Sequence, residues 1–128
     1  MKWMMLAHAT AMPTLPAHDL QRAIRFYRDT LGLSLIRATA GGVLFECGGT
    51  HLFIYESSNA GTARNTAMAF VVRDLQGEVT ALQRKGVRFE EYDFPGLKTV
   101  NGIADLEGEV SAWFIDSEGN TIAISQWT

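Results

Sequence analysis

Two segments with the same pattern decide the fold: HDLQRAIRFYRDTLGLSLI, from His18 to Ile36, and RDLQGEVTALQRKGVRFEE, from Arg73 to Glu91. In each, Asp-Leu-Gln opens a run whose apolar residues recur at helical spacing, which predicts a helix with one buried face. The chain therefore contains an internal repeat, and repeats of this length indicate a duplicated structural unit.

The ends of both predicted helices carry the expected signals. Asp19 and Asp74 stand at the N-cap positions, where a carboxylate accepts hydrogen bonds from free backbone amides. Gly32 and Gly86 stand where a helix ends in a residue of left-handed conformation. These four residues place the two helices at matching points of the two halves.

Short strands flank each helix and complete a repeated βαβββ unit. A strand precedes each helix, another follows it, and a glycine-containing hairpin closes each half. The predicted fold is α+β: one domain, residues 1–128, of two tandem modules forming curved half-barrels, with module one at about 10–57 and module two at about 66–126. The strand segments are AMPTLPA, SLIRA and VLFECGGTHLFIYE in module one, and TAMAFVV, VRFEE and AWFIDSEGNTIAIS in module two.

Between the middle strands of module two lies DFPGLKTVNGIADLEGE, from Asp93 to Glu109. Pro95-Gly96 and Asn101-Gly102 mark turns within it. With little other strand or helix signal it is predicted to be a long loop, either a functional lid or a plain surface connection.

Composition excludes several classes of function. The net charge is −3, from 14 acidic against 11 basic residues, and no basic stripe indicates nucleic-acid binding. No segment has the ~18 consecutive apolar residues of a membrane helix, and the apolar run near the start is shorter than the ~7–15 residues of a signal peptide. The single cysteine, Cys47, allows no internal disulfide. We expect a cytoplasmic protein without membrane or nucleic-acid partners.

The run DLQRAIRFYRDTLGL, from Asp19 to Leu33, and the closing hairpin AWFIDSEGNTIAIS resemble the vicinal oxygen chelate superfamily. This superfamily contains glyoxalases, bleomycin-resistance proteins and extradiol dioxygenases. Ser117 replaces the proline of the usual hairpin motif. The resemblance implies two modules that enclose a cavity, and it implies a homodimer.

The resemblance also implies where a metal would be held. The first and last strands of each module carry the ligands, and the matching positions here are Met12, Phe53, Ala67 and Ala123. Thioether, phenyl and methyl groups do not supply the nitrogen or oxygen donors that divalent metals require. The chain is therefore similar to a metal-free branch, with no cofactor expected.

Aromatic residues beside small residues on the predicted cavity strands indicate a slot for a partly aromatic organic molecule. His51 either lines this slot or is hydrogen-bonded within the sheet, and sequence leaves open which face Trp113 occupies. Tyr92 and Lys98 belong to EEYDFPGLKT. Its polar groups either close over a ligand or have no binding role, with Tyr92 packed against the protein and Lys98 solvated. The predicted ligand-binding residues are Met12, Thr14, His51, Phe53, Tyr55, Ala67, Ala69, Tyr92, Lys98, Trp113 and Ala123.

Two other functions remain open from sequence. The chain could be a metal-dependent lyase, isomerase or dioxygenase-like enzyme with unusual ligands such as His51 with Glu46 or Glu56. It could also be a structural or regulatory module that binds a partner. The preferred prediction is a glyoxalase/bleomycin-resistance-like protein that binds a small molecule without a catalytic residue or metal.

Overall fold

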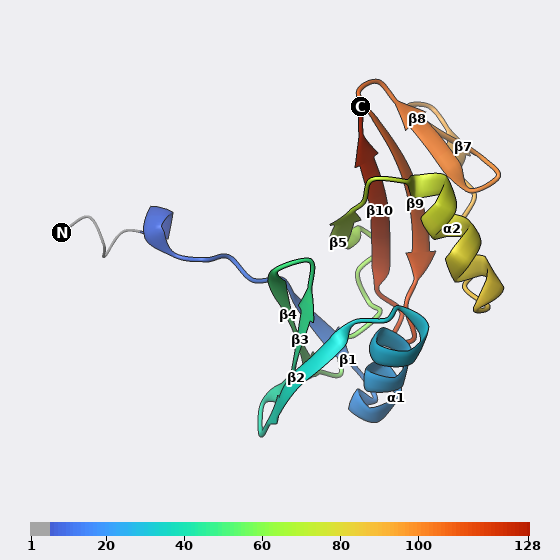
Figure 1. The fold of residues 1–128 in the computed structure, drawn as a ribbon. Helices are drawn as coiled ribbons and strands as arrows, with labels where there is room; N and C mark the ends of the chain where they lie inside the picture. Colours follow the sequence, from blue (N-terminus) through green and yellow to red (C-terminus); the bar gives the residue numbers. More distant parts are fainter. Residues whose placement is uncertain (1–5) are drawn as a thin grey trace.

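The computed structural model describes residues 6–128, which form two β-sheets with helices packed on them (Figure 1). A 3-10 turn, Leu6–His8, precedes module one. Module one contains β1 (Thr14–Ala17), α1 (Leu20–Arg25), a π-helical turn (Phe26–Thr30), β2 (Ser34–Thr39), β3 (Gly42–Cys47) and β4 (Thr50–Glu56). Module two contains β5 (Thr66–Val71), α2 (Leu75–Arg84), β6 (Asp93–Phe94), β7 (Leu97–Val100), β8 (Ile103–Leu106), β9 (Glu109–Ile115) and β10 (Thr121–Trp127).

The two sheets repeat one arrangement. The first has the strand order β1-β4-β3-β2, and the second has the order β5-β10-β9-β8-β7-β6. β1 pairs in parallel with β4, and β5 pairs in parallel with β10, so the first strand of each module lies at a sheet edge. This confirms the predicted α+β fold of two βαβββ modules.

The helix signals read from the sequence are confirmed. Asp19 Oδ1 accepts the Arg22 amide at 3.1 Å, and Asp74 Oδ1 accepts the Gly77 amide at 3.1 Å. Gly32 and Gly86 both have positive φ, as the predicted helix ends require. The first helix continues beyond Arg25 as a π-helical turn rather than as an α-helix.

The prediction of a long loop is wrong, because the segment 93–109 is made of short strands and turns. Asn101 and Gly102 adopt φ values of 53° and 81° and form a two-residue turn between Val100 and Ile103. Asn-Gly is the residue pair that such hairpin turns prefer. β8 then pairs with the first half of β9, so the segment extends the second sheet.

The predicted strand VRFEE is reduced to one bridge, between Phe89 and Phe114, and a hydrogen bond from the Glu90 amide to the Trp113 carbonyl at 2.8 Å. The physical reason is competition for one edge. β8 occupies β9 from Glu109 to Ala112, so only the last part of β9 is left for this segment.

The modules join where α1 meets the turn between β9 and β10, at the lower end of the second sheet in Figure 1. Tyr27 Oη donates to Asp116 Oδ2 at 2.6 Å, and both groups are buried. Arg22 forms an ion pair with Glu118, whose side chain is 1% exposed. Burial and the nearby Asp116 raise the pKa of the Tyr27 hydroxyl, so it remains a hydrogen-bond donor at neutral pH. These contacts fix the two modules to each other.

One face of each sheet packs into the shared core, and the opposite face carries the alternate residues of each strand. In β10, Ile122 and Ile124 lie in the core while Ala123 and Ser125 point to the opposite face. We call these opposite faces the concave faces of the two modules. Within residues 6–128, no helix is long and apolar enough to cross a membrane.

Candidate functional site

The concave face of module two has a centre of small residues. Ala123 pairs with Ala69 of β5 on one side and with Trp113 of β9 on the other. Next along the face, the Ser111 and Ser125 hydroxyls form a buried hydrogen bond of 2.8 Å. Ala123, Ser111 and Ser125 are all buried, and the hollows on this side of the sheet lie beside them rather than over them.

Aromatic side chains rise beside this centre. The Tyr92 ring lies edge-on to Trp113, with ring centroids 5.5 Å apart, and edge-on to Phe94, with centroids 6.0 Å apart. The Trp113 indole Nε1 donates to Thr66 Oγ1 at 3.2 Å, which fixes the ring on the concave face. We call Tyr92, Phe94 and Trp113 the aromatic cluster.

The aromatic cluster borders a groove built from two neighbouring hollows of about 250 and 430 Å³. Both hollows are lined by Arg64, Tyr92 and Thr121, so they are parts of one groove. Small and apolar residues complete its walls. The other lining residues are Gly61, Thr62, Ala63, Asn65, Thr66, Glu90, Phe94, Leu97, Trp113, Ile115 and Gly119.

The inserted strands hold Tyr92 in position. The Tyr92 amide donates to Thr99 Oγ1 at 2.8 Å, and the Thr99 amide donates to the Tyr92 carbonyl at 2.9 Å. Glu91 Oε1 accepts hydrogen bonds from Thr99 Oγ1 and from the Gly102 amide. The carboxylate thereby ties β7 and the Asn101-Gly102 turn to the segment that carries Tyr92.

The groove also carries charged and polar groups. Burial, together with the Glu90 carboxylate, raises the pKa of the Tyr92 hydroxyl, which stays protonated at neutral pH and can donate a hydrogen bond. Arg64 and Glu90 form no ion pair with another side chain of residues 6–128. The groove can therefore offer an aromatic wall, a neutral hydroxyl and one group of each charge.

The structure divides the predicted ligand-binding residues between two sheets. Ala67, Ala69, Tyr92, Trp113 and Ala123 belong to module two. Tyr92 and Trp113 line the groove, whereas Ala69 lines a separate hollow beside Cys47 and Val71, and Ala123 lies next to the groove through its pairing with Trp113. Lys98 pairs with Asp93. The next residue on each strand, Leu97 and Phe94, forms the adjacent ladder pair, and this pair lines the groove. Lys98 therefore occupies the other face of these strands.

The remaining predicted residues lie in or before module one. Thr14 pairs with Phe53, and Phe53 and Tyr55 share the concave face of β4 with His51. Tyr55 is 37% exposed and His51 is also exposed. Met12 precedes β1 and is 43% exposed. Within one chain these residues form a face separate from the aromatic groove.

The positions where the resemblance implies metal ligands do not fit a divalent metal. Phe53, Ala67 and Ala123 carry no donor atom, and Met12 offers only a thioether. Across residues 6–128, no group of three or more histidine, cysteine, aspartate or glutamate side chains could hold an ion. The donor chemistry disagrees with a metal centre at these positions, and the metal-free state remains a prediction.

Several groove residues were missed from sequence: Arg64, Thr66, Phe94, Leu97 and Thr121. Thr66 and Thr121 begin β5 and β10, and their alternation with core residues could have indicated the concave face. Phe94 and Leu97 flank Pro95-Gly96, a turn signal that could have paired them. Nothing in the sequence brings Arg64 to this face.

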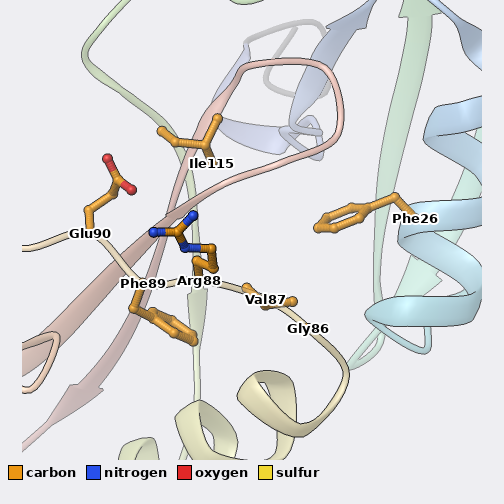
Figure 2. A pocket seen from close by; sticks show the side chains of 7 residues that line it. All are labelled: Phe26, Gly86, Val87, Arg88, Phe89, Glu90 and Ile115. Atoms are coloured by element: carbon orange, nitrogen blue, oxygen red, sulfur yellow. The ribbon is translucent and has the colours of Figure 1, made fainter.

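A further hollow of about 470 Å³ lies where the modules meet, between Phe26 of the π-helical turn and the segment 86–90 (Figure 2). Arg88 and Glu90 project to one side of this segment, while Phe89 points to the other side, where its ring stacks edge-on with Phe114. Glu90 and Ile115 also line the aromatic groove, so the two hollows adjoin.

A family model described as the Glyoxalase/Bleomycin resistance protein/Dioxygenase superfamily matches residues 6–124. The chain belongs to this superfamily, which confirms the resemblance found in the sequence. No curated protein matches the chain.

Solved structures share the fold at low sequence identity. A lactoylglutathione lyase from Agrobacterium tumefaciens is 22% identical, with a TM-score of 0.68 and 92% of each chain covered. A genomically encoded fosfomycin resistance protein from Listeria monocytogenes is 19% identical, with a TM-score of 0.68 and coverage of 94% of this chain and 93% of that one. An antibiotic-binding protein from Streptomyces sp. CB03234 is 19% identical, with a TM-score of 0.63 and coverage of 94% and 98%.

Proposed function

We propose that this protein binds a small, partly aromatic organic molecule in the aromatic groove of module two, without a catalytic metal. The observation that carries the proposal is the edge-on arrangement of Tyr92 with Trp113 and Phe94, three rings that line one wall of the groove. Ring edges and faces presented to an open hollow favour an aromatic guest. Burial of one ligand ring there contributes about 2–3 kcal/mol.

The charged groups make the groove selective. A ligand that carries an anionic group reaches Arg64, and a cationic group reaches Glu90, because both side chains line the same hollow. The Tyr92 hydroxyl adds a neutral donor. The fold neighbour from Streptomyces is described as an antibiotic-binding protein, which supports a binding function for this cavity.

A second copy of the chain completes the cavity in this proposal. The concave face of module one carries Phe53 and Tyr55, no layer formed by residues 6–128 covers it, and β1 and β5 are edge strands of their sheets. A homodimer that places module one of one copy against module two of the other would bring the two predicted groups of ligand-binding residues together. A twofold axis would build the cavity twice.

Metal-dependent catalysis is the alternative that the experiment must separate. Purified protein should be assayed for bound zinc, nickel, iron and manganese before and after dialysis against a chelator. The proposal expects less than 0.1 metal per chain and unchanged ligand binding after dialysis. Stoichiometric metal whose removal abolishes binding would overturn it.

Binding itself is tested by a thermal-shift screen against aromatic carboxylates, aromatic amines and aromatic antibiotics, followed by tryptophan fluorescence. A bound ring beside Trp113 should quench its emission. Trp113→Phe should remove the quench, whereas Trp127→Phe, at an indole outside the groove, should keep it. A quench that follows Trp127 instead would place the ligand elsewhere.

A further inference from the structure

The segment 6–13 leaves the body of the protein as an arm. The Phe53 amide still donates to the Pro13 carbonyl at 3.0 Å, and before Pro13 the chain projects away from both sheets (Figure 1). Every residue from Leu6 to Thr14 is exposed, and Leu6 is 89% exposed. The arm nevertheless ends in a formed 3-10 turn, with the Ala9 amide bonded to the Leu6 carbonyl at 2.9 Å.

The composition of the arm is typical of a segment that packs against protein rather than of one that stays in water. Its sequence, LAHATAMP, contains no acidic residue, no lysine and no arginine. Leu6 and Met12 stay exposed, at 89% and 43%, in the part of the chain that the structure describes. An apolar segment held away from its own core fits a surface supplied by another molecule.

The two modules have the same hand, and this restricts how a second copy can join. β2 runs parallel to β1, since β2 is antiparallel to β3, β3 to β4, and β4 is parallel to β1. By the same reasoning the bridge segment at Phe89 runs parallel to β5. Both are parallel crossovers through a helix, and such crossovers are right-handed. Seen from the concave face with the first strand pointing upwards, each sheet therefore extends to the same side of that strand.

That shared hand sets the direction of the joined edges. The free edge of β1 can face the free edge of β5 from a second copy, with both concave faces on one side, only if one module is rotated by 180° within the plane of its sheet. β1 then runs antiparallel to the second copy's β5. The N-terminal end of β1, from which the arm departs, lies at the C-terminal end of that β5, near Val71.

An apolar surface is exposed at that end of module two. Val71 pairs with Ser125, and Trp127 follows two residues later on the same face of β10. Val71 and Trp127 are each 65% exposed, although they lie beside the buried pair Ser111 and Ser125. The arm reaches about 26 Å when extended, which is more than the distance between two neighbouring strands of a sheet.

We propose that the arm, residues 6–13, docks on Val71 and Trp127 of a second copy of this chain and closes that end of the shared cavity. The inference rests on the dimer put forward under the proposed function and adds which segment exchanges and where it binds. Each arm covers the partner while its own module receives the partner's arm, as a twofold axis requires.

The first test removes the arm. Sedimentation velocity over a concentration series should give the dimer dissociation constant of the full chain and of a variant that lacks residues 2–11. We expect deletion to weaken the dimer by tenfold or more. Val71→Asp should weaken it similarly, whereas Val100→Asp should not, because Val100 has the same 65% exposure but lies on β7.

The second test traps the contact in a Cys47→Ser background. Met12→Cys with Val71→Cys should give a covalent dimer on mild oxidation, and Met12→Cys with Val100→Cys should not. A full-length dimer that is indifferent to arm deletion and is not trapped would overturn the docking and leave the dimer intact. A monomer at every concentration would overturn both, while ligand binding to the aromatic groove is scored separately by fluorescence.

Discussion

The Arg22 guanidinium binds the Glu118 carboxylate through two hydrogen bonds, from Nε to Oε2 at 2.8 Å and from Nη2 to Oε1 at 3.0 Å. The same carboxylate also accepts the Asp19 amide at 2.9 Å. A helix of module one is thus attached to the hairpin turn of module two by an ion pair in which the Glu118 side chain is almost wholly buried and the Arg22 side chain is partly exposed. The modules depend on this contact for their relative position.

Glu118→Gln should destabilise the protein by about 1–2 kcal/mol, because a neutral amide cannot accept hydrogen bonds from all four donors that face the carboxylate. The loss should depend on pH. Burial alone would raise the pKa of Glu118, but hydrogen bonds from Arg22, the Asp19 amide and Ser117 outweigh it and lower the pKa from 4.5 to about 2.

A lowered native pKa stabilises the protein above the unfolded pKa and loses that effect as the pH falls toward the native value. The difference in unfolding free energy between the wild type and Glu118→Gln should therefore be full at pH 6 and shrink between about pH 4.5 and 2. Urea unfolding at several pH values measures it. A difference that stays constant to pH 2.5 would contradict the assignment.

Gly61→Ala should cost more than an ordinary glycine replacement. A Cβ at Gly61 would lie 2.9 Å from the Glu118 carbonyl oxygen and 3.3 Å from the Gly119 Cα, and φ is +75°. Gly108 is the matched control, with φ of +95° and nothing within 4 Å. We expect about 1 kcal/mol for Gly108→Ala and about 2–3 kcal/mol for Gly61→Ala. Equal thermal shifts would show that the close approach between linker and turn is not maintained.

The Ser111–Ser125 hydrogen bond should appear as a coupling in a double-mutant cycle. Either serine changed alone to alanine leaves the other hydroxyl buried without its partner, which costs about 1–2 kcal/mol. The double variant should cost less than the sum of the single changes by about 1 kcal/mol. Strict additivity in denaturant unfolding would mean that each hydroxyl has another partner.

Tyr92→Ala should weaken binding of an aromatic ligand by tenfold or more, since it removes the ring that contacts both Trp113 and Phe94. Tyr92→Phe retains the ring and should lose only the contribution of the hydroxyl. Isothermal titration with a ligand identified by the thermal-shift screen distinguishes the two. An unchanged dissociation constant for Tyr92→Ala would remove the aromatic cluster from the site.

The local parts of the fold were predictable because their signals are local. Asp19 and Asp74 cap the helices, and Gly32 and Gly86 end them, through bonds and dihedral angles within a few residues. The Asn101-Gly102 turn was also visible in the sequence. Its strands were missed because four-residue strands show too little alternation to stand out from a loop.

The candidate site was less predictable because it depends on register. A shift of one residue moves a strand side chain to the other face, so Trp113 could not be assigned until its pairing with Ala123 was known. The same rule places Leu97 in the groove and Lys98 outside it. Arg64 comes from the linker, whose path is set by long-range contacts such as the close approach of Gly61 to Gly119 and the hydrogen bond between His18 Nε2 and the Ala60 carbonyl.

The attachment of Arg22 to Glu118 spans 96 positions of the chain. During synthesis the first helix therefore leaves the ribosome long before the carboxylate that anchors it has been made. Closing so long a loop costs conformational entropy of the intervening chain, which the contacts that close it must offset. The junction between the halves cannot close before Glu118 has been made, and until then the surface of module one that packs on module two stays uncovered.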